Sequence, residues 1–105
     1  MRTTLSNINL EGARIVRVIE DVDGHKMAFD VTYPMPEGGS DFPRRRFIFQ
    51  VCRRYLVDEG RGAGEPVIQR VEISEIDPHL VTIRMHTDHG VRELTCSPSV
   101  LEESA

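Results

Sequence analysis

Apolar and polar side chains alternate along most of this chain, and that rhythm limits what it can fold into. In the stretch HKMAFDVTY, residues 25–33, the large apolar side chains stand at odd positions. The odd positions hold Met27, Phe29, Val31 and Tyr33, and the polar even ones are Lys26, Asp30 and Thr32. A strand points successive side chains to opposite faces, so this spacing predicts a half-buried strand. No segment shows a sustained apolar stripe at helical spacing, and we expect an all-β chain.

Similar segments recur between stretches that are rich in glycine and proline. We expect strands over residues 13–20, 25–33, 44–57, 67–73, 80–86 and 91–96. About six strands with antiparallel connections predict a small antiparallel β-sandwich or a partly open β-barrel. The sequence leaves both architectures open.

The chain has the length of a single domain, residues 1–105. We expect an ordered core that spans about residues 10–97. The segment 98–105 begins with Pro98, which cannot donate a hydrogen bond to a strand ladder, and contains adjacent glutamates. We therefore expect an acidic C-terminal tail that frays into solvent.

Asp23-Gly24 lies between the first two expected strands and is a strong hairpin signal, because a type I′ turn needs positive φ at both central positions. A two-residue loop there places charges opposite charges and apolar side chains opposite apolar ones. The expected pairs are Asp21–Lys26, Arg17–Asp30, Val18–Phe29 and Val16–Val31. A slip by one residue would destroy both agreements, so the register is well specified.

Residues 44–57, RRRFIFQVCRRYLV, interleave arginine with aromatic side chains. We expect one long strand whose apolar face holds Phe47, Phe49, Val51, Tyr55 and Val57, with Arg53 interrupting that face at an edge or a bulge. Charge runs usually face water, and the second interpretation is a patch that binds an acidic protein or a small phosphate. The opposite face carries Arg44, Arg46 and Arg54, and the candidate anion- or partner-binding residues are Arg44, Arg46, Arg53 and Arg54.

RMHTDHGV, residues 84–91, contains a histidine pair and an aspartate, which suggests a metal site. Zinc needs at least three converging ligands, whereas a hairpin with residues 87–90 as its loop explains the stretch without a metal. The expected pairs are His86–Val91, Arg84–Glu93, Ile83–Leu94, Thr82–Thr95 and Val81–Cys96. Cys96 then lies about 15 Å from the loop, at about 3.3 Å per residue, and His89 sits at an exposed tip. We expect a turn and no metal; whether His25 and His79 join His86 and His89 in space stays open.

Nothing in the sequence has the spacing of a catalytic site. Cys52 and Cys96 stand in the middle of expected strands, where we expect free, buried thiols. Acidic pairs fall in turns and in the tail, so we expect no enzyme and no cofactor. The chain lacks an apolar run long enough for a signal peptide or a membrane span, and we expect a cytoplasmic protein with no membrane partner.

A formal net charge of −4 makes nucleic acid an unfavourable partner, because phosphate binding requires excess positive charge. Two functions remain. The first is a non-catalytic binding module that pairs with another protein or with itself as a homodimer. The second is a small-molecule or anion-binding β-barrel with weak or no enzymatic activity, with Arg53 and a histidine at its mouth. The surroundings of Arg53 separate the two.

Overall fold

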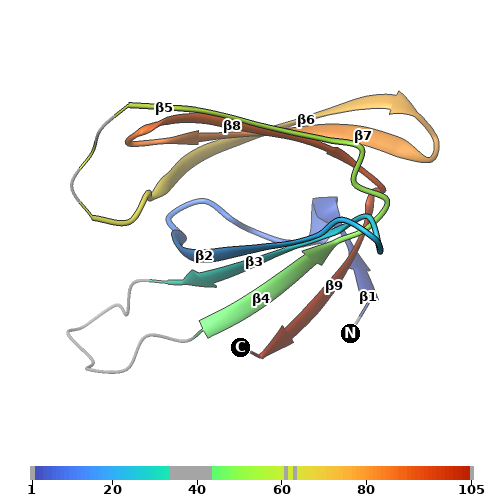
Figure 1. Ribbon diagram of the computed structural model, residues 1–105, viewed down its shortest axis with the longest axis horizontal. Coiled ribbons are helices and arrows are strands. Elements are labelled where there is room, and N and C mark those ends of the chain that lie inside the picture. The colour runs from blue at the N-terminus through green and yellow to red at the C-terminus, as the bar shows by residue number, and fades with distance from the viewer. Residues whose placement is uncertain (1, 34–43, 61, 63, 105) are drawn as a thin grey trace.

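The computed structural model describes residues 2–33, 44–60, 62 and 64–104. Two antiparallel sheets lie face to face, in the arrangement of a β-sandwich (Figure 1). The described residues form nine strands, and their only helical element is η1 (Leu5–Asn7), one turn of 3-10 helix. The all-β prediction is confirmed. The expected number of about six strands is too low, because strands form at both ends of the chain and one expected strand is split in two.

The five-stranded sheet, the lower one in Figure 1, has the order β1-β9-β4-β3-β2. Its members are β1 (Arg2–Thr4), β2 (Arg14–Asp21), β3 (Lys26–Thr32), β4 (Arg44–Phe49) and β9 (Ser99–Ser104). A row of alternating charges runs across its strands in register, formed by Arg17, Asp30, Arg46 and Glu103. Opposite charges on neighbouring strands stabilise this sheet and fix its register.

The four-stranded sheet has the order β5-β8-β7-β6. Its members are β5 (Arg54–Glu59), β6 (Ile68–Asp77), β7 (Leu80–Thr87) and β8 (Gly90–Cys96). The β6–β7 hairpin projects beyond the five-stranded sheet at the right of Figure 1. Only Ile68 of β6 is fully buried, and Ile73 is 45% exposed.

The core lies between the sheets and takes side chains from both. Phe29 and Phe49 of the five-stranded sheet meet edge to face, with ring centroids 5.3 Å apart. Tyr55 of the opposite sheet meets Phe29 in the same geometry at 5.8 Å. Ile83 and Leu94 are fully buried above them. The alternation seen in the sequence therefore buries one side of each sheet against the other.

The β7–β8 hairpin has the register expected from the sequence, and every predicted pair is confirmed. The loop is shorter than expected, because Thr87 also pairs with Gly90 and leaves Asp88-His89 at the turn. The Thr87 hydroxyl accepts hydrogen bonds from the backbone N–H groups of His89 and Gly90, both at 3.1 Å. Gly90 has a φ of 148°, and the backbone of Asp58 leaves no room for a Cβ there.

The β2–β3 hairpin has three of its four expected pairs: Arg17–Asp30, Val18–Phe29 and Asp21–Lys26. The fourth prediction, Val16–Val31, is wrong, because a bulge lets Ile15 face Val31 instead. The type I′ turn is also wrong, since positive φ falls on His25 (52°) and not on Asp23 or Gly24. The Asp21 side chain accepts a hydrogen bond from Gly24 N at 3.0 Å, and this bond favours a longer loop.

The expected strand over residues 44–57 is wrong, because the chain changes sheets in its middle. β4 ends at Phe49, β5 begins at Arg54, and Val51 between them has a φ of 53°. The apolar side chains keep their odd positions through the crossing, so Tyr55 meets the core from the opposite sheet. The interruption of the period at Arg53 marks this change of sheet and not a bulge or an edge.

The C-terminal tail is ordered, contrary to expectation. Residues 99–104 form β9 between β4 and β1, and Val100 is fully buried. Pro98 stands just before this strand, where its missing N–H is not needed, and its carbonyl accepts a hydrogen bond from Leu5 N at 3.0 Å. The ordered part therefore extends beyond 10–97 in both directions.

Candidate functional site

The arginines selected from the sequence lie on different elements. Arg44 and Arg46 belong to β4, Arg54 belongs to β5 of the other sheet, and Arg53 lies in the segment between. The expectation that Arg44, Arg46 and Arg54 share one face is wrong, because the chain changes sheets between them. Their role in binding stays a prediction.

Arg46 forms an ion pair with Asp30 within the five-stranded sheet. Its Nε and Nη2 donate to the two carboxylate oxygens of Asp30, at 2.7 and 3.0 Å. Asp30 is 6% exposed, and the hydrogen bonds from Arg46 hold the pKa of its carboxyl below the usual value despite burial. Such a bidentate pair fixes the guanidinium, so Arg46 stabilises the five-stranded sheet.

Arg53 lies where the chain crosses between the sheets (Figure 1). Residues 50–53 lead from β4 to β5, and residues 97–98 lead from β8 back to β9. Backbone N–H groups join the two crossings and the β2–β3 loop: Ser97 N to Gln50 O at 2.9 Å, Cys52 N to His25 O at 2.7 Å, and Arg53 N to Thr95 O at 2.9 Å. The position of Arg53 is therefore fixed by backbone bonds.

Val51 is the most unusual residue of this crossing. Its φ of 53° is left-handed, a conformation that costs a side-chain-bearing residue about 1–2 kcal/mol and is rare for a β-branched one. Its side chain is 47% exposed, so core packing does not explain the choice of valine. Backbone strain of this kind is concentrated at sites that bind something.

Three hollows surround Arg53. One, of about 220 Å³, runs between β2 and β5 and is lined by Glu20 and Tyr55 among others. A second, of about 470 Å³, is lined by His25, Val51, Cys52 and Arg53. The third, of about 490 Å³, lies under the β6–β7 turn. Arg53 borders all three, so this exposed residue lies where the rims of the three hollows meet.

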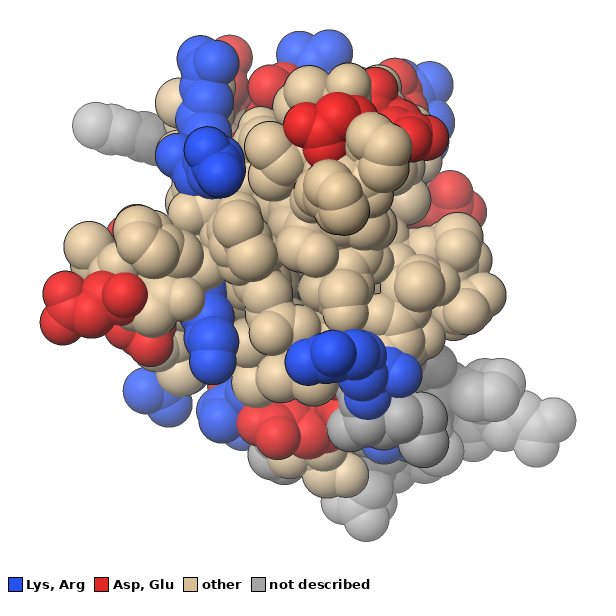
Figure 2. All heavy atoms as spheres, turned by 90° about the vertical axis from the view of Figure 1, so that its right-hand side faces the viewer, with Lys and Arg blue, Asp and Glu red and all other residues tan. Residues whose placement is uncertain are grey.

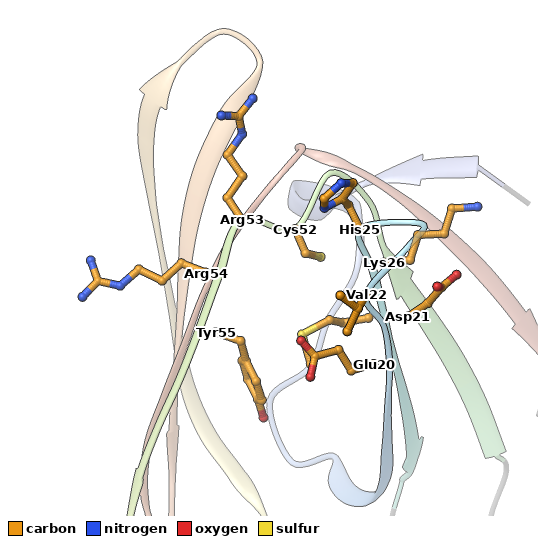
Figure 3. Close-up of a pocket in the computed structure, with 10 residues that line it drawn as sticks. Glu20, Asp21, Val22, His25, Lys26, Cys52, Arg53, Arg54 and Tyr55 are labelled. Carbon is orange, nitrogen blue, oxygen red and sulfur yellow. The ribbon is translucent and has the colours of Figure 1, made fainter.

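Figure 3 shows the hollow of about 220 Å³ in close-up. Tyr55 and Cys52 approach it from the β5 side, whereas Glu20 and Val22 approach it from the β2 side. The side chains of Arg53 and Arg54 extend away from it in different directions. The arginines are therefore offered to solvent at the rim and not to the interior.

This end of the molecule forms one surface, which we call the end face. It comprises residues 77–80 and 97–98 with Val22, His25, Val51 and Arg53. Figure 2 views it directly: uncharged side chains fill its centre, and Lys, Arg, Asp and Glu lie around its margin. No salt bridge joins Arg53 to an acidic group among the described residues, whereas Arg46 has such a bridge. The end face thus combines an uncharged centre with one cation that has no described acidic partner.

The four histidines do not gather at one point. His25 and His79 line neighbouring hollows at the end face. His86 instead lies on the outer face of β7, with Nε2 at 2.7 Å from Glu72 Oε1. His89 is wrongly predicted to be exposed: its side chain is 11% exposed, and its ring packs against Gly62. Within the described ranges, no group of three His, Cys, Asp or Glu could hold a metal ion.

A buried ion pair on the inner face of β5 and β8 is absent from the sequence-based candidates. Arg92 donates to both carboxylate oxygens of Glu59, at 2.9 and 2.8 Å, and to the Tyr55 hydroxyl at 3.1 Å. The Thr87 hydroxyl bonds Glu59 Oε2 at 3.0 Å, and these bonds lower the pKa of the Glu59 carboxyl. The register of β7 and β8, which sets Arg92 opposite the buried Met85, carries the signal that was overlooked.

The two thiols are free, and both are poorly reactive. Burial raises the pKa of Cys52 to about 11 and that of Cys96 to about 12. Cys52 Sγ donates to the Phe49 carbonyl at 3.2 Å. A thiol must ionise to act as a nucleophile, so neither cysteine is activated for catalysis.

Comparisons with known proteins found no matching family model, curated protein or solved structure. In the part of the chain that the structure describes, no helix has the length and apolarity to cross a membrane. Any functional conclusion therefore rests on the geometry of the chain itself.

Proposed function

We propose that this chain is a non-catalytic binding domain whose end face contacts a protein segment carrying an aliphatic side chain next to a carboxylate. Arg53 carries the proposal, because it stands exposed among three hollows without a described salt-bridge partner. A carboxylate would meet this guanidinium with charge-assisted hydrogen bonds.

The uncharged centre of the end face supports a protein partner. The centres of protein interfaces are depleted of charged side chains, and this face has its charged side chains around the margin. The molecule measures 41 × 32 × 24 Å, and the end face lies across its two shorter axes. The ten residues that define the end face are fewer than the roughly 20–30 that one partner contributes to a standard interface, so this face suits a short protein segment.

The strain at Val51 supports the same surface. Glycine would adopt this φ without the steric cost, yet the chain has a valine with its side chain half exposed. An aliphatic side chain held in solvent at the centre of a concave region suits an apolar contact with a partner. Val22, also exposed, extends the apolar area of this face.

Selection from a displayed random-peptide library tests the proposal. Immobilised native protein should enrich peptides that combine a carboxylate with an aliphatic residue, and Arg53→Ala should weaken the selected peptides at least tenfold, because hydrogen bonds to charged groups contribute about 1.5–3 kcal/mol. Arg84→Ala is the matched control, since Arg84 is an exposed arginine on the outer face of β7 that pairs with Glu93. Equal binding by the native protein and Arg53→Ala would refute the proposed function.

A second candidate function is the binding of a small anion between Arg53 and the two histidines of the end face. It is favoured by His25 and His79, which line the hollows on either side of Arg53. Titration with inorganic phosphate, followed by the backbone amide NMR signals of residues 51–53, separates the two candidates. Saturable shifts that Arg53→Ala abolishes would support the anion site, and shifts that Arg53→Ala leaves unchanged would reject it.

A further inference from the structure

β6 has a free edge in the described structure. It is the longest strand and lies at the end of the four-stranded sheet, with β7 on its other side. Its first residue is covered, since Ile68 N donates to Ala13 O at 2.8 Å and Gly12 N donates to Ile68 O at 2.7 Å. Bulges follow Ile68 and precede Asp77, so the regular free stretch covers residues 70–75.

The ladder shows which backbone groups point to this edge. Gly60 N donates to His89 O at 2.8 Å, so the backbone groups of His89 point toward β5. Because backbone groups alternate in direction along a strand, the N–H and C=O groups of odd-numbered residues in β8 point toward β5, and those of even-numbered residues point toward β7. The registers of β7 with β8 and of β6 with β7 extend this alternation to β6. The backbone N–H and C=O groups of Arg70, Glu72 and Ser74 therefore point toward β7. The N–H and C=O groups of Val71 and Ile73 therefore face outward.

An apolar groove runs beside the free stretch. It has a volume of about 180 Å³ and lies between β6 and the segment that contains η1. Its apolar lining comprises Leu5, Ile8, Leu10, Val71, Ile73 and Ile83. Ile73 is 45% exposed, and a strand added to β6 would cover it. Alternate side chains of that strand would enter the groove, while the others would lie on the outer face.

The charges along this edge indicate which polar side chains the partner strand would carry between its apolar ones. Within residues 70–75, the acidic Glu72 and Glu75 outnumber a single cation, Arg70, and Glu11 lies at the groove. Arg70 Nη2 already pairs with Glu72 Oε1 at 2.8 Å. A second copy of this chain would bring two acidic edges together, whereas basic side chains opposite Glu72 would be attracted.

We propose that the free edge of β6 accepts an extended segment of another protein in which apolar and basic residues alternate. Backbone groups of Val71 and Ile73 bind its main chain, the groove takes its apolar side chains, and Glu72 on the outer face meets its basic ones. This site goes beyond the proposed function, because it uses a surface away from Arg53.

The test uses a fluorescein-labelled peptide of alternating valine and lysine, with its acidic valine–glutamate counterpart, in fluorescence anisotropy. Ile73→Pro removes an N–H that points to the edge and spares the ladder to β7, so folding should survive. Ile73→Lys places a cation in the path of the basic strand. Both variants should weaken binding of the basic peptide at least tenfold, which corresponds to about 1.4 kcal/mol.

Val57→Lys is the matched control. Val57 is a half-exposed valine on β5, the other edge of the same sheet, and the substitution makes the same change of charge. It should leave binding unchanged, as should Arg53→Ala, which separates this site from the end face. Equal affinity for the acidic and basic peptides, equal effects of Ile73→Lys and Val57→Lys, or a native dimer that Ile73→Pro dissociates would each overturn the proposal.

Discussion

Arg92 and Arg53 differ in whether a carboxylate of the same chain neutralises their positive charge. Arg92 lies largely covered between the sheets, with 14% of its side chain exposed, and Glu59 and Tyr55 accept its hydrogen bonds. Arg53 stands in solvent at the end face, without a salt bridge to any described acidic residue. Both are arginines at strands or crossings of the four-stranded sheet, yet their surroundings differ in burial and in partners.

The difference teaches how to recognise a side chain that is available for binding. A buried charge must be neutralised inside the protein, because an unpaired ion in a low dielectric is strongly destabilising. The bonds of Arg92 therefore serve folding. An exposed arginine needs no internal partner, so its position among concave surfaces is informative about ligands. Each variant below changes either the Arg92–Glu59 ion pair or a residue of the end face.

Arg92→Ala should have the largest effect. The substitution leaves the Glu59 carboxylate, which is 10% exposed, without its cation, and the loss of hydrogen bonds between charged groups should cost about 1.5–3 kcal/mol. Urea unfolding should show a correspondingly lower free energy of unfolding. A change below about 1 kcal/mol, the value typical of an exposed pair, would contradict the role assigned to burial.

Acid should reproduce part of that loss. Hydrogen bonds from Arg92 hold the pKa of Glu59 below its ordinary value of 4.5, so the stabilisation is complete above that pH and is lost as the pH falls through the folded-state pKa. The free energy of unfolding should decrease between about pH 5 and pH 2. Glu59→Gln should make this decrease smaller, and an unchanged pH profile would show that other carboxyls account for it.

Val51→Gly should raise stability by about 1 kcal/mol, because glycine relieves the left-handed strain at this position. The gain should appear as a higher midpoint of urea unfolding. The same change removes the exposed aliphatic side chain, so affinity for the peptides selected by the end face should fall. A variant that is both more stable and equally tight in binding would show that Val51 is not retained for contact.

Arg53→Ala should have the smallest effect on stability, within about 0.5 kcal/mol, since an exposed side chain without a partner is removed. Thermal unfolding should coincide with that of the native protein. Together with the weaker peptide binding of the same variant, this result would show that the substitution acts on binding and not on stability. A loss as large as that of Arg92→Ala would remove the contrast between the two arginines.

The sequence was most informative where pairing is local. The pairs from His86–Val91 to Val81–Cys96 follow from charge and apolar matching across one short turn, and all are present. The Arg17–Asp30 pair was found in the same way. Cross-strand matching works there because only one turn separates the partners, and a shifted register would oppose unlike side chains.

Contacts between distant segments escaped that reasoning. Arg53 is the one interruption of the odd–even rhythm in residues 44–57, and it was interpreted as an edge or a bulge and not as a change of sheet at Val51. Glu59 and Arg92 lie on strands whose pairing could not be read from a turn. The hollows at Arg53 combine segments near residues 25, 78 and 97, and their meeting depends on the stacking of the two sheets.

The pairing of β1 with β9 bears on how the chain would respond to force. Arg2 lies opposite Leu101 and Thr4 opposite Ser99, so both ends of the described chain leave the ladder on the same side. Tension applied to the two ends would open the hydrogen bonds one after another, as in a zipper, rather than load them together. The first mechanical event would therefore be the peeling of β1, at low force, with the stacked sheets still intact.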